Sequence, residues 1–343
     1  MTRLFAAEFA KLAEKTLPLR VRRALRLVVI SSLFFVRLAA AQDPHLLVIT
    51  GVSGDAEHAT KFNGWALKLI DAAKTKDGVP DANIVYLAEK TEIDSRVRAR
   101  STRENVEKAV ADFAGAVHPN DEVFIVLIGH GSFDGRVAAF NLPGPDLTAA
   151  DWAALLGKLA PAHVTFVNTS SSSGPFQAAL AGPGRTVVTA TKTGGERNET
   201  RFGEFFTEAF GDPSADADRN GHVSVLEAFD YAKNKVVKAY EQGGFLLTEH
   251  AILDDGSDGK MAASQFLAAH PADGGLSIDR SDPALRTLAD EREGIQKQID
   301  ALKLQKATLD AARYDQEMEK LLTELAIKTK AIRDLQAAKG QKK

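Results

Sequence analysis

Short apolar runs alternate with amphipathic stretches along the chain from residue 45 onward. Near-continuous apolar runs are typical of strands in a parallel sheet that helices cover on both faces. Strands are predicted at 45–50, 83–88, 122–129, 163–168 and 185–190, and helices at 59–73, 102–117 and 148–159. The pattern predicts an α/β fold with three layers and a mostly parallel central sheet.

Beyond the fifth predicted strand, the chain shows helical spacing. Phe202, Phe205, Phe206 and Phe210 share one face of a predicted helix, and a second helix is predicted over 226–240. From residue 283 to 338, apolar residues recur every seven positions, in two heptad registers. This repeat predicts a coiled coil or a long helical hairpin. The change of frame favours the hairpin. The two series are Leu288, Ile295, Leu302, Leu309 and Met318, Leu325, Ile332.

The first 41 residues follow the order of a signal peptide. A basic stretch that ends at Arg26 precedes the apolar run 27–36, and three alanines end at Ala41. Arg37 interrupts the apolar run, and a start at Val21 would give a signal of ordinary length. The sequence therefore predicts a secreted or periplasmic protein. The alternative is an anchor helix that is not cleaved, although the run is shorter than the roughly 20 residues that a span needs.

Composition excludes some classes of function. The formal net charge is -3 and the pI is about 6.3, so no overall basic field favours nucleic acid as a partner. The chain has no cysteine. Disulfides, thiolate metal sites and thiol nucleophiles are therefore excluded.

The segment 216–227 matches an EF-hand calcium loop at every ligand position. Such a loop places oxygen ligands at positions 1, 3, 5, 7, 9 and 12 and glycine at position 6. Gly221 is at position 6 and Val223 supplies an apolar residue at position 8. The predicted Ca²⁺ ligands are Asp216, Asp218, Asn220, the carbonyl of His222, Ser224 and Glu227. We therefore expect an EF-hand-type segment over 201–265, with a structural role at high external calcium.

A second acidic run, 254–259, copies part of this pattern. Gln265 occupies the place where position 12 would be. This run could pair with the first loop or could be an acidic turn.

Polar residues follow two of the predicted strands. In parallel sheets, ligands and catalytic groups lie outside the carboxyl ends of the strands. His130 and Gly131 follow the third predicted strand, and a run of small residues from Asn168 to Gly174 follows the fourth. These two strand ends are the candidate site.

A His-Gly after the third strand and a small-residue turn with Ser-Gly after the fourth resemble the caspase and legumain peptidases. The resemblance covers residues 45–190 and, more weakly, extends to about 258. It implies a caspase-like domain over 42–200 with His130 as the histidine of the site and Gly131 as an oxyanion donor. Ser171 then occupies the position of the family's cysteine, with Gly174 three residues later.

Serine at that position changes the chemistry. A cysteine near neutral pH is already partly thiolate, whereas a serine hydroxyl needs a base in direct contact, itself oriented by a third group. Asp134 is the nearest acidic residue after His130. The first hypothesis is therefore a proteolytically inactive homologue that binds a peptide or protein ligand or self-associates through its C-terminal helices. The alternatives are an active hydrolase with a Ser171–His130 dyad and a calcium-stabilised envelope scaffold.

Two further groups are chemically suggestive. Arg197 and Arg201 follow the fifth predicted strand and could bind an acidic substrate group, although salt bridges within the protein are the expectation. The run from Thr248 to His250 contains metal-ligating residue types but lacks a second histidine at ligand spacing.

Overall fold

The computed structural model describes residues 44–118, 121–159, 162–268, 276, 278, 282–304 and 310–340. The predicted signal segment and its alternative start lie outside these residues. None of the described helices is both long and apolar enough to cross a membrane.

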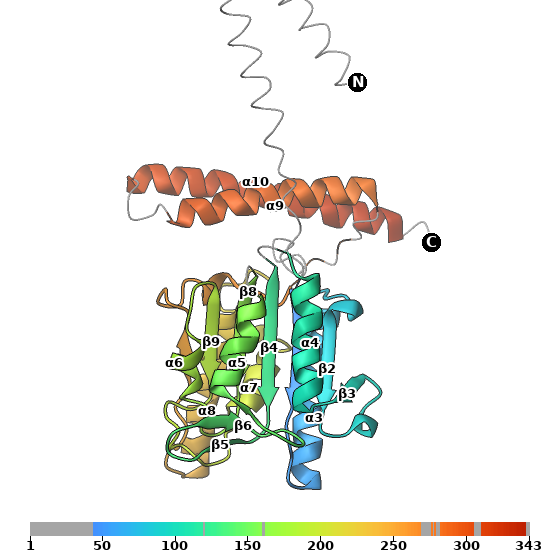
Figure 1. The fold of residues 1–343 in the computed structure, drawn as a ribbon. Helices are drawn as coiled ribbons and strands as arrows, with labels where there is room; N and C mark the ends of the chain where they lie inside the picture. Colours follow the sequence, from blue (N-terminus) through green and yellow to red (C-terminus); the bar gives the residue numbers. More distant parts are fainter. Residues whose placement is uncertain are drawn as a thin grey trace, which may run out of the picture. The chain divides into compact units, whose positions relative to one another are not determined.

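The core of the fold is a seven-stranded sheet in the order β10-β9-β8-β4-β1-β2-β3 (Figure 1). All neighbouring strands run parallel except β10, which is antiparallel to β9. The fold class predicted from the apolar runs is confirmed. The strands are β1 Pro44–Thr50, β2 Ile84–Ala88, β3 Val97–Arg100, β4 Glu122–Ile128, β8 His163–Asn168, β9 Arg185–Thr189 and β10 Ile252–Asp254.

Alternate residues of each central strand enter opposite hydrophobic cores. In β1, Leu46 and Val48 join the core under one face, whereas Leu47 and Ile49 join the core under the other. This alternation follows from the two-residue period of a strand. Because both faces of the sheet carry apolar side chains, helices cover both of them. Helices α3, α7 and α8 contribute to the first core and α4, α5 and α6 to the second.

Side-chain caps fix where these helices begin. Helix α3 starts three residues before the predicted position because Asp55 accepts the His58 N–H at 2.8 Å. Thr148 and Asp151 form a capping box at the start of α5, which gives way to a 3₁₀ turn at Gly157. The helices are α3 Ala56–Thr75, α4 Arg103–Ala116, α5 Ala149–Leu156, α6 Phe176–Leu180, α7 Phe202–Ala209 and α8 Val225–Gly243.

The sequence pattern did not predict the short strands. A second, antiparallel sheet directly follows β4 and consists of β5 Gly131–Phe133, β6 Ala138–Phe140 and β7 Leu147–Thr148. These strands have two or three residues each, which is too short for a periodicity to be recognised. The small sheet begins at Gly131, which is one of the predicted site residues.

The C-terminal helices α9 Pro283–Leu304 and α10 Ala311–Gly340 pack against each other in antiparallel orientation. The Lys328 ammonium lies 2.6 Å from the Glu291 carboxylate, and Arg292 Nε donates to Thr329 Oγ1. An apolar seam lies between the two helices. It contains Ile295, Ile299, Leu302, Tyr314, Met318, Leu321 and Leu325. The predicted heptad residue Leu309 lies outside the described residues.

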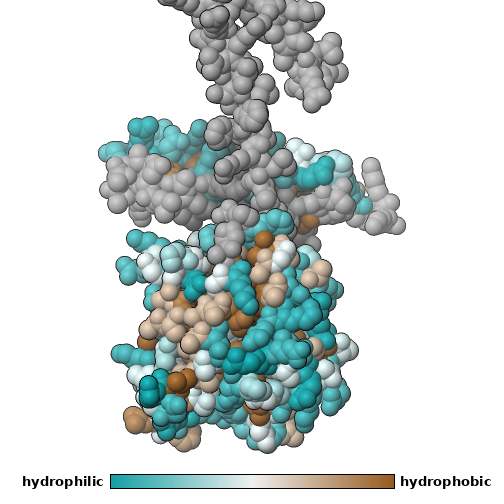
Figure 2. Space-filling view, viewed as in Figure 1, coloured by the Kyte–Doolittle hydropathy of each residue, from teal (hydrophilic) through white to brown (hydrophobic). Residues whose placement is uncertain are grey.

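The α/β part buries most of its apolar side chains, and its surface is correspondingly polar. The face of the α/β part shown in Figure 2 is mostly hydrophilic, with hydrophobic side chains scattered among polar ones.

Candidate functional site

The His130 ring is held at the carboxyl end of β4 by a backbone carbonyl. Its Nε2 lies 3.3 Å from the carbonyl oxygen of Ser53, in the connection between β1 and α3, so this nitrogen carries the proton and donates. The ring also meets Phe62 edge-on at a centroid distance of 5.3 Å. These contacts fix the orientation of the imidazole and leave Nδ1 as the acceptor in the neutral ring.

Ser171 lies in the turn that follows β8 and is almost buried. Its hydroxyl donates to the carbonyl of Gly131 at 3.2 Å. The next residue, Ser172, has the left-handed φ of 55°, and its N–H donates to the carbonyl of Glu196 at 2.8 Å. The turn is therefore built around backbone contacts from the loops after β4 and β9.

Gly131 brings the two strand ends together. Asn141 N–H donates to the His130 carbonyl, which makes Gly131 and Phe140 a non-hydrogen-bonded pair in the small sheet. The N–H and carbonyl of Gly131 therefore face away from β6, and the carbonyl meets Ser171. A Cβ on Gly131 would lie 2.3 Å from the Ser171 carbonyl oxygen, so only glycine fits here.

The described hydrogen bonds do not form a relay from a carboxylate through His130 to Ser171. Both side chains bond to backbone carbonyls, of Ser53 and Gly131 respectively. Asp134, the acidic residue considered from the sequence, accepts the N–H groups of Arg136 and Val137 in an exposed turn. A serine hydroxyl without a contacting base is a weak nucleophile.

A second histidine, which sequence reasoning missed, lies beside His130. The His58 and His130 ring centroids are 5.2 Å apart. His58 Nδ1 lies 2.8 Å from the Asp55 carboxylate, and Nε2 lies 3.3 Å from the Glu199 carboxylate. The hydrogen bond that His58 donates to Asp55, and then the one that it donates to Glu199, raises the pKa of His58 above its usual 6.5. The available signal was its place in the first turn of α3, the helix that follows β1.

The other residues considered from the sequence have roles inside the protein. Arg197 donates to the Phe133 carbonyl at 3.2 Å. The buried Glu249 accepts the N–H groups of Arg201 and Phe202 at the start of α7, and burial raises the pKa of its carboxyl. His250 lies 3.2 Å from the Glu196 carboxylate. The contacts of Glu249 and His250 join the segment before β10 to the loop after β9 and the start of α7, and the contact of Arg197 joins that loop to β5.

In the predicted calcium loop, one carboxylate oxygen from each of Asp216, Asp218 and Glu227 lies within 4.8 Å of the other two. Arg219 and Gly221 have φ values of 58° and 96°, the sharp turn that such a loop needs. Asp216 accepts the N–H groups of Asn220 and Gly221, which curls the loop around the three carboxylates. The donor set and the turn both fit a Ca²⁺ ion.

Glu227 and Ser224 also form a capping box at the start of α8. One Glu227 oxygen accepts the Ser224 N–H and hydroxyl, and the other accepts the N–H groups of Ala217 and Asp218. The same carboxylate therefore closes the loop and begins the helix.

The loop is tied to the amino ends of the strands. Ser224 forms a bridge with Phe266, and Val225 N–H donates to the Gln265 carbonyl at 3.0 Å. The Gln265 side chain in turn contacts Thr186 and Glu122, at the start of β9 and β4. His130 and Ser171 lie at the opposite, carboxyl ends, so the predicted calcium loop is not part of the candidate site.

The second acidic run serves as a turn in this structure. Burial acts to raise the pKa of Asp255, but the N–H groups of Ala262, Gly259 and Ser257 outweigh it and lower that pKa to about 2. Gln265 is buried among sheet residues and does not face this run as a ligand.

Neither a family model nor a curated protein matches this chain. Among solved structures, GSU0716 from Geobacter sulfurreducens is 14% identical, with a TM-score of 0.39 over 62% of this chain and 92% of its own. The caspase drICE is 8% identical, with a TM-score of 0.37 over 64% of this chain and 89% of its own. Overlap at this level is partial, and the chemistry of the site rests on its own residues.

Proposed function

We propose that this protein is a caspase/legumain-like peptidase homologue that binds a peptide or protein ligand without cleaving it. The observation that carries the proposal is the bonding of Ser171, whose hydroxyl donates to the Gly131 carbonyl and not to the imidazole of His130. Among the residues that the structure describes, His130 is oriented by a carbonyl and not by the carboxylate that stabilises an imidazolium in Ser-His-Asp sites.

Ligand binding is favoured because segments from three parts of the fold meet at the two strand ends. Gly131 at the start of β5 and Glu196 in the loop after β9 contact the Ser171 turn, and Ser53 in the connection after β1 contacts His130. Gly131 also turns its N–H toward the Ser171 side, where it can donate to a ligand carbonyl.

The proposal includes a structural Ca²⁺ in the loop 216–227. Three clustered carboxylates and a glycine turn support it, and the ties of the loop to Glu122 and Thr186 support a bracing role. It also includes export by the N-terminal segment, with an uncleaved anchor as the alternative. A calcium site of moderate ligand charge suits an external compartment where calcium is abundant.

A panel of fluorogenic peptides with basic, acidic and Asn residues before the scissile bond tests the central claim. We expect no turnover by the wild type in the presence of calcium. We expect Ser171→Cys to gain cleavage, because a thiolate needs less help from the imidazole. The control is Ser171→Cys combined with His130→Ala, which should remain inactive.

Turnover by the wild type that both Ser171→Ala and His130→Ala abolish would overturn the proposal and favour the hydrolase. Absence of cleavage in every variant, together with absence of peptide binding, would favour the scaffold.

A further inference from the structure

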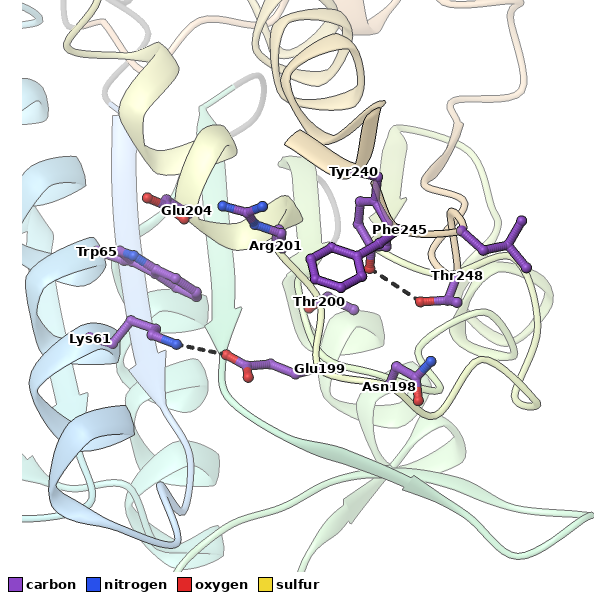
Figure 3. A pocket seen from close by; sticks show the side chains of 11 residues that line it. Lys61, Trp65, Asn198, Glu199, Thr200, Arg201, Glu204, Tyr240, Phe245 and Thr248 are labelled. Carbon is purple, nitrogen blue, oxygen red and sulfur yellow. Dashed lines mark hydrogen bonds and ion pairs between the residues drawn. The ribbon is translucent and has the colours of Figure 1, made fainter. Parts of the chain in front are cut away.

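A pocket of about 760 Å³ adjoins the candidate site through Glu199 (Figure 3). One oxygen of the Glu199 carboxylate lies 2.9 Å from Lys61, and the other lies 3.3 Å from His58, which packs on His130. Glu199 and His58 therefore link the pocket to His130, and Lys61 and Trp65 of α3 line it. Its lining residues are Lys61, Trp65, Asn198, Glu199, Thr200, Arg201, Glu204, Tyr240, Phe245, Leu246 and Thr248.

One wall of the pocket is apolar and strongly exposed. Phe245 and Leu246 are 72% and 85% exposed, the highest fractions among the exposed large apolar residues of the described chain. Tyr240 lies on the same side as Phe245, and Figure 3 shows the buried Trp65 of α3 on the opposite side of the pocket. Adjacent large apolar side chains left in water at the mouth of a pocket indicate a binding surface.

The backbone that carries this wall is fixed before any ligand binds. Helix α8 ends at Gly244, whose φ of 66° is left-handed, and Phe245 N–H donates to the Tyr240 carbonyl at 3.0 Å. Tyr240 and Thr248 hydroxyls lie 3.2 Å apart, which joins the helix to the following segment. A rigid scaffold with exposed apolar side chains loses little conformational entropy when it binds a ligand.

The rim of the pocket selects for a peptide over an acyl chain or an anionic surface. It carries two cations, Lys61 and Arg201, and two carboxylates, Glu199 and Glu204, so it has no net charge of one sign. Asn198, Thr200 and Thr248 add hydrogen-bond donors and acceptors. Mixed polar groups around an apolar wall match the amides that flank a side chain in a peptide.

We propose that this pocket binds the large apolar or aromatic side chain of a peptide segment whose backbone continues into the His130–Ser171 site. The inference rests on the proposed peptide-binding function and adds the class of side chain that is recognised.

The fluorescence of Trp65 provides a probe of peptide binding to this pocket. It has two tryptophans, of which Trp65 lines the pocket and Trp152 is buried in the core on the other face of the sheet. The full-length Trp152→Phe variant isolates Trp65 emission, and Trp152 Nε1 has no hydrogen-bond partner to lose among the described residues. The ligands are capped seven-residue Gly/Ser peptides with Phe, Leu or Ala at the centre.

We expect the Phe and Leu peptides to shift the Trp65 emission with saturation and to bind roughly tenfold or more tightly than the Ala peptide. Phe245→Ser combined with Leu246→Ser should remove this preference without a change in folding, because both side chains are exposed. The matched control changes two exposed apolar residues of α10, Leu322→Ser and Ile327→Ser. This variant should retain the preference for the Phe and Leu peptides over the Ala peptide.

Equal binding of the Phe and Ala peptides, or a preference that survives the Phe245/Leu246 change, would overturn the inference and leave the proposed function standing. Absence of binding by every peptide would overturn both. Binding of phosphatidylglycerol vesicles, or self-association, that depends on Phe245 and Leu246 while the peptides fail to compete would also overturn the inference.

Discussion

At the scale of single residues, the candidate site depends on a glycine more than on its polar groups. Gly131 lets the Ser171 turn approach the small sheet, because its absent Cβ leaves room for the Ser171 carbonyl and the Ser170 hydroxyl. The Ser171 hydroxyl then bonds to the Gly131 carbonyl. The geometry of the serine is therefore set by the backbone of its neighbour.

Gly131→Ala should lower the free energy of unfolding by about 1–3 kcal/mol, because the new Cβ would overlap backbone that cannot easily move. Urea unfolding followed by circular dichroism measures this. Gly64→Ala is the control: Gly64 is inside α3 with no atom within 4 Å of the added Cβ. That variant should gain about 0.5–1 kcal/mol. A Gly131→Ala protein as stable as the wild type would contradict the packing argument.

At the scale of elements, the start of α3 is joined to the loop after β9 by an imidazole between two carboxylates. Asp55 both caps α3 and contacts His58 Nδ1, and Glu199 contacts Nε2. The pKa of His58 is raised by these partners. The contact is therefore complete when the imidazole is protonated and both carboxylates are ionised.

A group whose pKa is raised in the folded state contributes stability below its unfolded pKa and loses it as pH rises through the folded value. The difference in melting temperature between wild type and His58→Gln should therefore be larger at pH 6 than at pH 9. Differential scanning calorimetry across this range measures it. His118→Gln, at a largely exposed histidine, is the control and should show a smaller change. A pH-independent difference for His58→Gln would be inconsistent with this account.

The loop before α8 gives a second prediction at this scale. Because calcium would bind the folded loop and not the unfolded chain, it should stabilise the protein by about 2.7 kcal/mol at a free concentration of one hundred times Kd. Chelation with EGTA should therefore lower the melting temperature. Glu227→Gln should abolish this response, and Glu241→Gln, at an exposed position near the end of the same helix, should preserve it. An unchanged melt on chelation would count against the calcium site.

At the scale of the whole chain, the hydrophobic cores are separate. Two cores lie on opposite faces of the sheet, and the apolar seam of α9 and α10 contains only residues of those two helices. The two cores of the sheet therefore bury their apolar side chains without any residue of α9 or α10.

A chain that ends at Asp282 should retain the main melting transition and the far-ultraviolet signal of the α/β fold, with the loss of helical signal from α9 and α10. Calorimetry and circular dichroism of the truncated protein check this. Light scattering of both forms also tests self-association through these helices, which the full chain alone should show. Failure of the shortened chain to fold would show that the hairpin supports the sheet.

The sequence by itself determined the five main strands, most of the helices around them and the spacing of the calcium loop, because these follow from local periodicity and from ligand order along the chain. It also indicated the two strand ends that meet in the candidate site. The tertiary structure alone decided what each group there contacts. Ser53 and His58 lie more than 70 residues before His130, and Glu199 lies almost 70 residues after it, so only folding brings Ser53 and His58 to His130 and Glu199 to His58. Nothing in local spacing encodes which oxygen accepts the hydrogen bond of the Ser171 hydroxyl, since that depends on how the backbones of two segments pack.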